Sequence, residues 1–466
     1  SISSDRNGYI KSIDFSGDFN TGAYASWGPT VANRVPVHAS GPYRVPNYQA
    51  VGRAIHTNGP IAGAFRGFGV PQATALQETL MDQLADKLKI DQLEFRLQNS
   101  LKDGDKTVCG QKLDSVGIID CLDALKESWK QKKEDFINFN KTSKRYKKGL
   151  GIATCWYGCG NTALPNPSTI KIGLTKSGRI SLHQGATDIG QGSNTVISQI
   201  TADAIGVSMK DLDLVSPDTF LTPDCGKTSA SRQTYVTGKA AHNAGLKLRS
   251  EILRLSNMGN DSLIKIENNK IIISNQDKKQ IIDLISLQLI ENNYVIVVEE
   301  TYDPPTTSLD ENGQGIPYAV YGYGAQMAEI SIDIELGLLK IDKITAAHDL
   351  GKTINPLLAE GQIEGGIAQG IGFALMEEYI PSKTENLHDY LIPSIGDVPE
   401  IVSILIEKSD PEGPFGARGL GEHVLIPTAP AILNALRNAT GAIITKLPAL
   451  PHRILDAIEK SKNGSN

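Results

Sequence analysis

The sequence Ala64-Phe65-Arg66-Gly67-Phe68-Gly69, followed directly by Pro71-Gln72, alternates large side chains with glycine. Glycine lets the backbone approach a neighbour closely, so this pattern is typical of a loop packed against a bound group. A second run, Gly419-Leu420-Gly421-Glu422, sets a glutamate in a glycine turn before an expected helix. That placement suits a carboxylate held in a cleft. Taken singly, each run also suits an ordinary turn, because glycine is common there.

The composition is that of a globular protein with more than one core. A chain of 466 residues exceeds one ordinary core, so we expect at least two domains. The net charge of −6 and the lack of a basic stripe argue against a nucleic-acid partner. No apolar run reaches the roughly 18 residues of a membrane span, so we expect no membrane partner. The five cysteines contain no CxxC pair, which favours reduced thiols and a cytoplasmic location over disulfides or an iron–sulfur site.

Strands and helices are expected to mix without regular βαβ alternation, which predicts an α+β fold. A polar, basic stretch over 130–148 is interpreted as a solvated linker, so the predicted domains are residues 1–145 and 146–466. Apolar periodicity and turn residues predict the individual elements. The expected helices are 71–101, 116–129, 193–205 (capped by Ser193 or Asn194), 230–256, 356–378 and 427–439; the expected strands are 9–15, 149–154, 169–183, a hairpin within 265–283, and the pair 326–334 and 338–347.

Four glycine-flanked polar segments recur after the expected linker, over 188–195, 227–232, 361–365 and 419–422. Three of them precede or open an expected helix, where free N–H groups face anions and glycine lets the backbone close on a phosphate or pterin edge. Gln191 and Gln362 add amides that both donate and accept hydrogen bonds. For any one segment, turn glycines and helix caps are the simpler explanation. No P-loop, no HExxH and no nucleophile–base pair is present, and His423 is the only suggestive histidine.

Taken together and in this order, the segments resemble the molybdenum hydroxylase family, the xanthine dehydrogenase and aldehyde oxidase relatives. The resemblance covers nearly the whole chain, and Glu422 falls on the family's catalytic glutamate. It implies a molybdopterin-binding subunit of xanthine dehydrogenase type, with mixed sheets and packed helices in two elongated domains, the first of them incomplete. The segments that carry it are Gly41-Pro42-Tyr43, Thr57-Asn58, the 65–72 and 188–195 runs, Ser229-Ala230-Ser231, Asp349-Leu350-Gly351, 361–365, Asp397-Val398-Pro399 and 419–422.

The resemblance also implies a set of site residues. Arg34 is similar to an arginine that contacts the heterocyclic substrate, although a surface salt bridge is an equal alternative for it. Phe68 falls on one of two aromatic residues that sandwich the substrate, but Asn161-Thr162 stands where the second is expected, and Trp156 or Tyr157 is a candidate to compensate. The substrate-binding residues are therefore Arg34, Phe68, Asn161 and Thr162; the cofactor-binding residues are Phe65, Arg66, Gly67, Gly190, Gln191, Gly192, Thr195, Ser229, Ala230, Ser231, Gln362 and Gly421.

What the resemblance implies about function is hydroxylation of an electron-poor carbon of an N-heterocycle, such as a purine or nicotinate, with water as the oxygen source. Glu422 would be the general base. The implied cofactor is molybdopterin in its cytosine dinucleotide form, with molybdenum held by the pterin dithiolene and by no side chain. The implied partners are an N-terminal molybdenum-subunit chain, a 2Fe-2S chain and an FAD chain, so we expect an obligate complex. Two alternatives are an aldehyde oxidoreductase and a non-catalytic structural or cofactor-carrier subunit.

Overall fold

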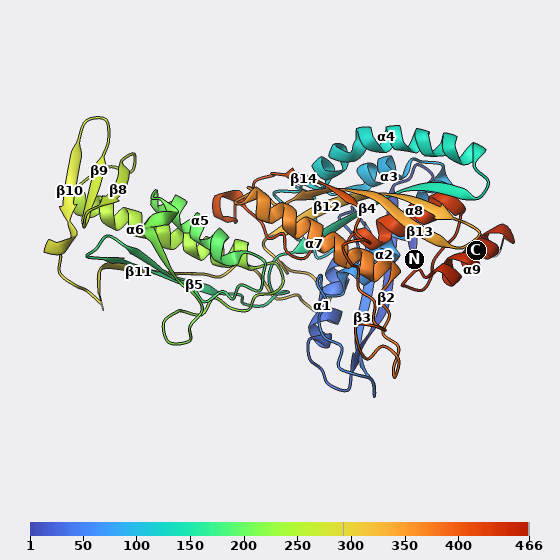
Figure 1. The fold of residues 1–466 in the computed structure, drawn as a ribbon, viewed down its shortest axis with the longest axis horizontal. Helices are drawn as coiled ribbons and strands as arrows, with labels where there is room; N and C mark the ends of the chain where they lie inside the picture. The colour runs from blue at the N-terminus through green and yellow to red at the C-terminus, as the bar shows by residue number, and fades with distance from the viewer. Residues whose placement is uncertain (292, 465–466) are drawn as a thin grey trace.

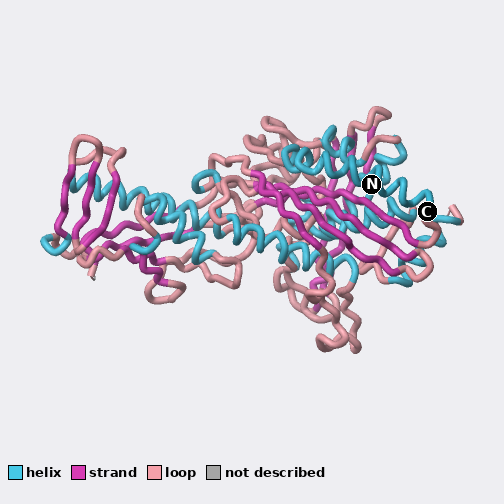
Figure 2. The backbone as a smooth tube through the Cα atoms, turned by 45° about the horizontal axis from the view of Figure 1, so that its top comes forward, coloured by secondary structure: helices cyan, strands magenta, loops and turns pink. Residues whose placement is uncertain are grey.

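The computed structural model describes residues 1–291 and 293–464, which form an elongated molecule with two lobes (Figure 1). Both ends of the chain lie in the larger lobe. The chain passes into the smaller lobe after β4 (Tyr146–Gly158) and returns to the larger one with β12 (Tyr321–Asp333). Figure 2 shows strands and helices in both lobes, and among the described residues no sheet is shared between them. The chain therefore passes between the lobes twice, once in each direction.

A four-stranded sheet of order β14-β13-β12-β4 forms the centre of the larger lobe. Its β12 is buried along nearly its whole length because helices cover both faces. On one face Met327 shares a core with Leu125 of α4, and on the other Ile330 shares a core with Ile363 of α7. Only β13 and β14 run parallel. The remaining elements here are β13 (Leu338–Asp349), β14 (Glu400–Ile406), α4 (Ile118–Thr142), α7 (Pro356–Leu375), α8 (Thr428–Thr440) and α9 (Pro451–Lys462).

A three-stranded sheet and three helices complete the larger lobe. The strands β2 and β3 are parallel and are joined by a crossover through α1, and β1 pairs antiparallel with β2. These elements are β1 (Ile2–Ser4), β2 (Ile10–Gly22), α1 (Gly28–His38), β3 (Asn47–His56), α2 (Val70–Leu88) and α3 (Gln92–Asn99).

The smaller lobe packs α5 and α6 against a sheet of order β11-β5-β6-β7, and it carries a three-stranded antiparallel sheet at its far end (Figure 1). A π-helical turn over Gln233–Thr237 leads into α6. The elements are β5 (Ser168–Thr175), β6 (Ile180–His183), α5 (Ser193–Ile205), β7 (Leu212–Val215), α6 (Gly238–Ser256), β8 (Leu263–Glu267), β9 (Lys270–Ser274), β10 (Lys279–Asp283) and β11 (Tyr294–Tyr302).

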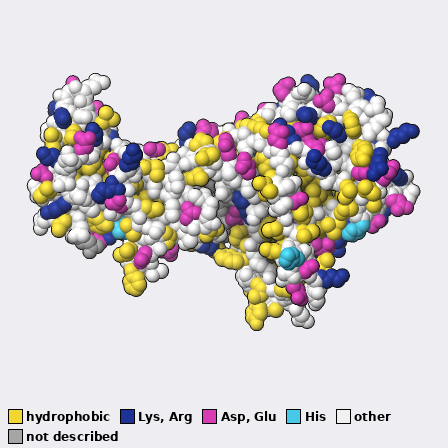
Figure 3. Space-filling view, viewed as in Figure 1, with side chains coloured by type: hydrophobic (Ala, Val, Ile, Leu, Met, Phe, Trp, Pro, Cys, Tyr) yellow, Lys and Arg dark blue, Asp and Glu magenta, His cyan; other side chains and the backbone are white. Residues whose placement is uncertain are grey.

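Several expected elements are confirmed. The α+β class holds, the helix over 193–205 is α5, and the hairpin is β12 with β13. The glycine-rich helix α7 packs closely, as expected. Gly366 lies against Val424, just before α8, and Gly370 lies against Thr428, the first residue of α8. Among the described residues, no helix is both long and apolar enough to cross a membrane. Figure 3 shows charged side chains of both signs scattered over one face.

Other expectations are wrong. The helix over 71–101 is two helices, because Lys89 adopts a left-handed conformation and Asp91 caps a new start. The linker over 130–148 does not exist, since α4 continues to Thr142 and β4 follows at Tyr146. The region 169–183 holds two strands, and the helix expected from residue 230 begins only at the π-helical turn. The division at residue 145 stays a prediction.

A buried ion network holds α2, α3 and β4 together. The Arg96 guanidinium lies 2.7 Å from Glu78 Oε2 and 2.8 Å from Asp82 Oδ1, and all three side chains are fully buried. Glu78 also accepts hydrogen bonds from the Tyr43 hydroxyl at 2.7 Å and the Thr154 N–H at 3.0 Å. Burial raises the pKa of Asp82 to about 6, although the charge of Arg96 opposes the shift. The two carboxylates therefore depend on Arg96 as their counter-ion.

We predict that Arg96→Met lowers the free energy of unfolding by about 3–5 kcal/mol, because it leaves two buried carboxylates without their counter-ion. Urea unfolding followed by tryptophan fluorescence measures this. The matched control is Arg53→Met, which removes a pair with Asp18 whose side chains are 55% and 57% exposed; its urea midpoint should not move. Equal midpoints for the two variants would contradict the assigned role of the network.

Candidate active site

The main cleft, about 550 Å³ in volume, lies where the two lobes meet. Loops that precede helices converge on it from both lobes: one before α2, one before α5, one before α6 and one before α8. The helix α7 adds Gln362 and Gln369 to the lining. All five of these segments contain a glycine-rich or glycine-flanked run that the sequence singled out. The fold therefore gathers in one place motifs that are far apart along the chain.

Glu422 lies at the edge of this cleft and is 8% exposed. Its Oε2 accepts a hydrogen bond from the Tyr157 hydroxyl at 2.7 Å and another from the Gly67 N–H at 2.8 Å. Its Oε1 accepts none from the described residues, which leaves that oxygen for a ligand. Burial, together with the Glu422 carboxylate, holds the pKa of Tyr157 well above its usual range although Arg34 opposes the shift, so Tyr157 remains a donor.

The backbone around Glu422 is strained and closely packed. Phe68, Ala230 and Ser231 all have positive φ angles, of 49°, 57° and 54°. Gly67 has φ of 94°, which only glycine adopts easily, and this conformation aims its N–H at Glu422. The Glu422 N–H in turn donates to Ser231 Oγ at 2.9 Å. Such strain persists only where the surroundings fix it, and it clusters at functional sites.

Arg66 connects the first glycine-rich run to α7. Its Nε donates to the Gly421 carbonyl at 2.5 Å, Nη1 to Gln369 Oε1 at 2.9 Å and Nη2 to Gln362 Oε1 at 3.0 Å. Because the two amide oxygens accept from Arg66, the amide NH₂ groups of both glutamines are free to donate. Arg66 is therefore a residue that orients the lining of the cleft.

The loop before α5 is shaped by Asp188. Its carboxylate accepts hydrogen bonds from the N–H groups of Gly190, Gly192 and Asn194 at 2.9, 3.3 and 3.1 Å. Burial opposes ionisation, but these three bonds hold the pKa of Asp188 below its usual range. The expectation that Ser193 or Asn194 caps α5 is wrong, because the N-cap residue is Gly192 and no side chain caps the helix there.

A second cleft of about 330 Å³ adjoins the first and shares Phe68 and Ser229 with it. All four predicted substrate-binding residues line this cleft. Arg34 is only 1% exposed; it donates to the carbonyls of Gly158, at 2.9 Å, and Gly160. It is therefore not a surface ion pair. Its guanidinium also lies 5.3 Å from the Phe68 ring centroid and 4.7 Å from that of Tyr157.

The missing second aromatic is not replaced by Trp156. Its ring stacks on Tyr321 in the core at 4.7 Å, away from the cleft. Asn161 donates to the Pro165 carbonyl at 3.1 Å, and the Thr162 hydroxyl bonds to that of Tyr318. Trp27, which the sequence interpretation did not select, provides the second aromatic wall: its ring meets that of Phe68 edge to face at 6.1 Å.

The predicted cofactor-binding residues divide into three groups. Most line the main cleft: Phe65, Arg66, Gly190, Gln191, Ser229, Ser231, Gln362 and Gly421. Gly67 and Ala230 act beside it, the first through its hydrogen bond to Glu422 and the second in the lining of the adjoining cleft. Gly192 and Thr195 line neither cleft. These assignments stay predictions.

Sequence reasoning missed several residues of the site and overrated one. Tyr157 was considered only as a substitute aromatic, and Asp188 and Gln233 were not selected for a role. Gln369 belongs, with Gly370, to a segment that resembles the family's pterin-binding segments, but it was not among the predicted site residues. The role of Asp188 could have been predicted from the sequence, since an aspartate before a glycine turn often accepts from the turn's N–H groups.

His423 is the residue that was overrated. It is fully buried next to Glu422, with its ring 5.0 Å from that of His348, and burial lowers its pKa well below the usual range.

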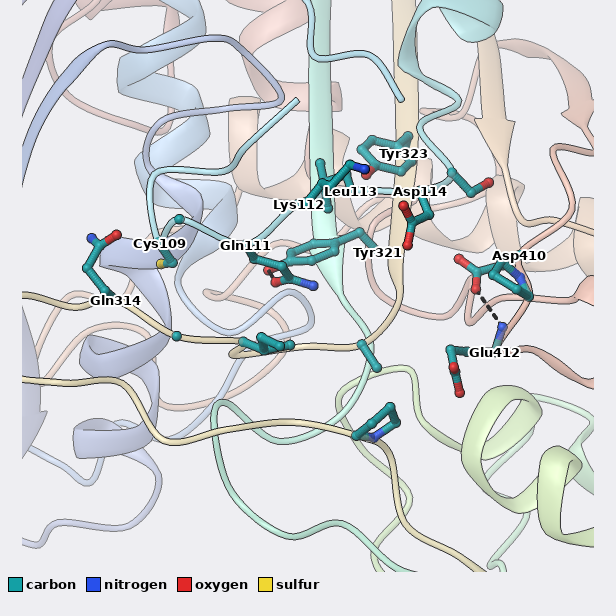
Figure 4. A pocket seen from close by; sticks show the side chains of 17 residues that line it. Cys109, Gln111, Lys112, Leu113, Asp114, Gln314, Tyr321, Tyr323, Asp410 and Glu412 are labelled. Atoms are coloured by element: carbon teal, nitrogen blue, oxygen red, sulfur yellow. Dashed lines mark hydrogen bonds between the residues drawn. The ribbon is translucent and has the colours of Figure 1, made fainter. Parts of the chain in front are cut away.

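Another cleft, of about 620 Å³, lies apart from these residues (Figure 4). It is bordered by the 109–115 loop, by Tyr321 and Tyr323, and by Asp410 and Glu412. The Tyr302 hydroxyl donates to Glu412 at 2.8 Å. None of the predicted site residues lines this cleft, so its larger volume does not make it the candidate site. Over residues 1–291 and 293–464, no group of three His, Cys, Asp or Glu side chains could hold a metal ion.

Fold and site together define a protein of the molybdenum hydroxylase type. The chain matches the molybdopterin cofactor-binding domain over residues 123–399 and a second such domain over residues 1–100. It therefore belongs to the molybdopterin cofactor-binding domain family.

Individual relatives support this family assignment. The xanthine dehydrogenase molybdenum-binding subunit of Escherichia coli O157:H7 is 32% identical over 97% of this chain and 60% of its own length. The aldehyde oxidoreductase of Megalodesulfovibrio gigas is 31% identical over 94% of this chain and 46% of its own. The crystal structure of the aldehyde oxidoreductase from Desulfovibrio desulfuricans matches with a TM-score of 0.87 and 29% identity, over 97% of this chain and 48% of that one. The chain thus spans about half to three-fifths of the length of these relatives.

The lining of the main cleft fits a pterin. Four glutamines border it, Gln191, Gln233, Gln362 and Gln369. The amide NH₂ groups of Gln362 and Gln369 are free to donate to the nitrogen and oxygen atoms of a pterin edge, because only their oxygens are used, by Arg66. The amides of Gln191 and Gln233 bond within their own loops. The buried Ser229 Oγ has no hydrogen-bond partner among the described residues, so it too is available to a ligand. Glu422 is the only carboxylate that the described part of the chain places in the lining.

We predict that Tyr157→Phe lowers kcat roughly tenfold with little change in KM, because Glu422 loses one of the two donors that hold it and hydrogen bonds to charged groups contribute about 1.5–3 kcal/mol. Steady-state kinetics of the assembled, cofactor-loaded enzyme measures this. The acid limb of its pH–activity profile should also move to higher pH.

The matched control is Tyr235→Phe, which removes a buried hydroxyl bonded to Tyr302 at 2.9 Å, away from Glu422. Its pH profile should stay in place. A Tyr157→Phe profile that also stays in place would show that this hydrogen bond does not position Glu422.

Proposed function

We propose that this chain is the molybdenum-binding catalytic part of a hydroxylase that adds oxygen from water to an electron-poor carbon of an N-heterocycle. The observation that carries the proposal is the place of Glu422, with one carboxylate oxygen fixed and the other free, in the lining of the main cleft and close to the smaller cleft that adjoins it. The net reaction converts R–H and H₂O into R–OH, two protons and two electrons. Glu422 accepts the proton that water loses as its oxygen attacks carbon.

Molybdenum held by a bound pterin would supply the two-electron redox chemistry. The residues that would hold the pterin are Gln191, Gln362 and Gln369, with Arg66 orienting the last two. Phe68 and Trp27 supply aromatic walls for a flat ring, and Arg34 places a fixed positive charge beside it, which favours negative charge developing on the ring.

The finer details of cofactor and partners belong to the same proposal. They are the cytosine dinucleotide form of the pterin, and separate chains that carry the N-terminal molybdenum segments, a 2Fe-2S cluster and FAD. The support is that relatives of this chain are named as molybdenum-binding subunits. The five cysteines are all free and buried, which supports a cytoplasmic location.

A second candidate is oxidation of an aldehyde to a carboxylate. Two observations favour it: Asn161 replaces the expected second aromatic, and a relative at 31% identity is named an aldehyde oxidoreductase. The fixed charge of Arg34 favours the heterocycle instead. A purely structural role is disfavoured, since a carrier needs no strained loop holding Glu422.

We predict that Glu422→Gln lowers kcat at least about a hundredfold while molybdenum stays bound, because the variant keeps the shape of the side chain but loses the base. Turnover of a purine, a pyridine and an aldehyde, divided by the molybdenum content of each preparation, measures the effect. Near-normal turnover by metal-loaded enzyme would exclude Glu422 as the base.

We predict that the double variant Gln191→Ala, Gln362→Ala loses most of its molybdenum while its unfolding midpoint changes little, because both side chains line the cleft and neither belongs to a core. Metal analysis of the purified complex measures the loss. The control Gln276→Ala, Gln280→Ala removes two exposed amides of the far sheet and should keep full occupancy. Equal occupancy in the two variants would remove these glutamines from the pterin site.

A further inference from the structure

The smaller cleft is positively charged. Arg34 and Lys227 both line it, and no aspartate or glutamate of the described residues does. The other polar groups in its wall are hydroxyls and amides, including Thr30, Asn33 and Ser229. Two positive charges in one cleft without a carboxylate repel each other, and an anionic ligand relieves that repulsion.

The two cations are not equivalent. Arg34 is buried, and its Nη1 and Nη2 already donate to backbone carbonyls, so it contributes charge and the single unpartnered Nε–H. Lys227 stands at the exposed rim of the cleft. Its Nζ makes no ion pair or hydrogen bond with the described residues. The available donor with three N–H bonds is therefore Lys227.

Trp27 fixes where the Lys227 ammonium lies. Nζ is 4.6 Å from the centroid of the Trp27 ring, a cation–π distance. Partial burial, together with the positive charges of Arg232 and Arg34, lowers the pKa of Lys227. Asp224, close by in sequence, does not line the cleft, and its Oδ1 accepts from the Gly226 N–H at 2.7 Å. The Lys227 ammonium is thus held over the Trp27 ring, in the wall of the smaller cleft.

We propose that this cleft selects an aromatic heterocycle bearing a ring carboxylate, and that Lys227 is the specificity-determining residue that pairs with the carboxylate. The ring lies against Phe68, which itself meets Trp27 edge to face, and the carboxylate reaches Lys227 at the rim. This inference rests on the proposed function and narrows its substrate class. A neutral purine or a simple aldehyde gives Lys227 no counter-ion, whereas a charge-assisted hydrogen bond to a carboxylate is among the stronger polar contacts.

The experiment uses the assembled enzyme and two substrates that differ only in charge, pyridine-3-carboxylate and pyridine-3-carboxamide. Lys227→Met should raise KM for the carboxylate roughly 10- to 100-fold, the range expected for a hydrogen bond to a charged group. KM for the carboxamide should change less than about twofold, since no charge pairs with Lys227 there. Lys227→Arg should keep most of the preference, because it retains the charge.

A second measurement does not depend on turnover. Isothermal titration with benzoate and with benzamide gives the Kd of each non-reacting ring, and the benzoate Kd alone should rise in Lys227→Met. Equal losses for charged and neutral rings, no effect of the substitution, or no benzoate binding by the unaltered enzyme would each overturn the proposal. A neutral purine whose KM depends equally on Lys227 would overturn it as well.

The two proposals fail in different ways. Lys227-dependent benzoate binding with full activity in Glu422→Gln would remove the proposed mechanism and leave the carboxylate site. Hydroxylation that requires Glu422 but shows no preference for a carboxylate would keep the mechanism and remove the role of Lys227.

Discussion

Glu422 Oε2 accepts two hydrogen bonds, from the Gly67 N–H and the Tyr157 hydroxyl, and the rest of the site depends on this contact. It joins three segments of the larger lobe that are distant in sequence, and the Glu422 N–H joins a fourth through Ser231 of the smaller lobe. A carboxylate that is 8% exposed is costly unless donors satisfy it. The loops therefore hold one another in place, and the two clefts meet beside one free carboxylate oxygen.

The scaffold behind these loops explains how they tolerate strain. The strand β12 is buried on both faces, and glycines of β4 let α8 approach closely: a Cβ at Gly149 or Gly151 would collide with backbone atoms of that helix. The Arg96 network fixes α2 and α3 against the same sheet. Loops that leave such rigid elements can keep left-handed residues such as Phe68 and Ser231 without relaxing. The position of the Glu422 side chain is thus fixed by packing in parts of the larger lobe that do not touch it.

Much of the fold was readable from local pattern, and the errors have physical causes. The helix over 193–205 and the hairpin of β12 and β13 carry strong periodicity and clear turn residues. The break between α2 and α3 was missed because apolar spacing continues across Lys89 and Asp91. The second half of α4 was mistaken for a linker, because a helix exposed to solvent on most of its surface has the composition of a linker.

By itself the sequence singled out the glycine-flanked segments that meet in the main cleft, their order, and the position of Glu422, because those features are local: a residue type and its immediate neighbours. Only the tertiary structure decided what each side chain faces. Tyr157 meets Glu422 across 265 residues of sequence, and the terminal nitrogens of Arg34 donate to the Gly158 and Gly160 carbonyls. Lys227 lies over the Trp27 ring and has no counter-ion among the described residues. A side chain's role depends on its partners and on the water removed around it, and both are fixed by packing between distant segments rather than by local pattern.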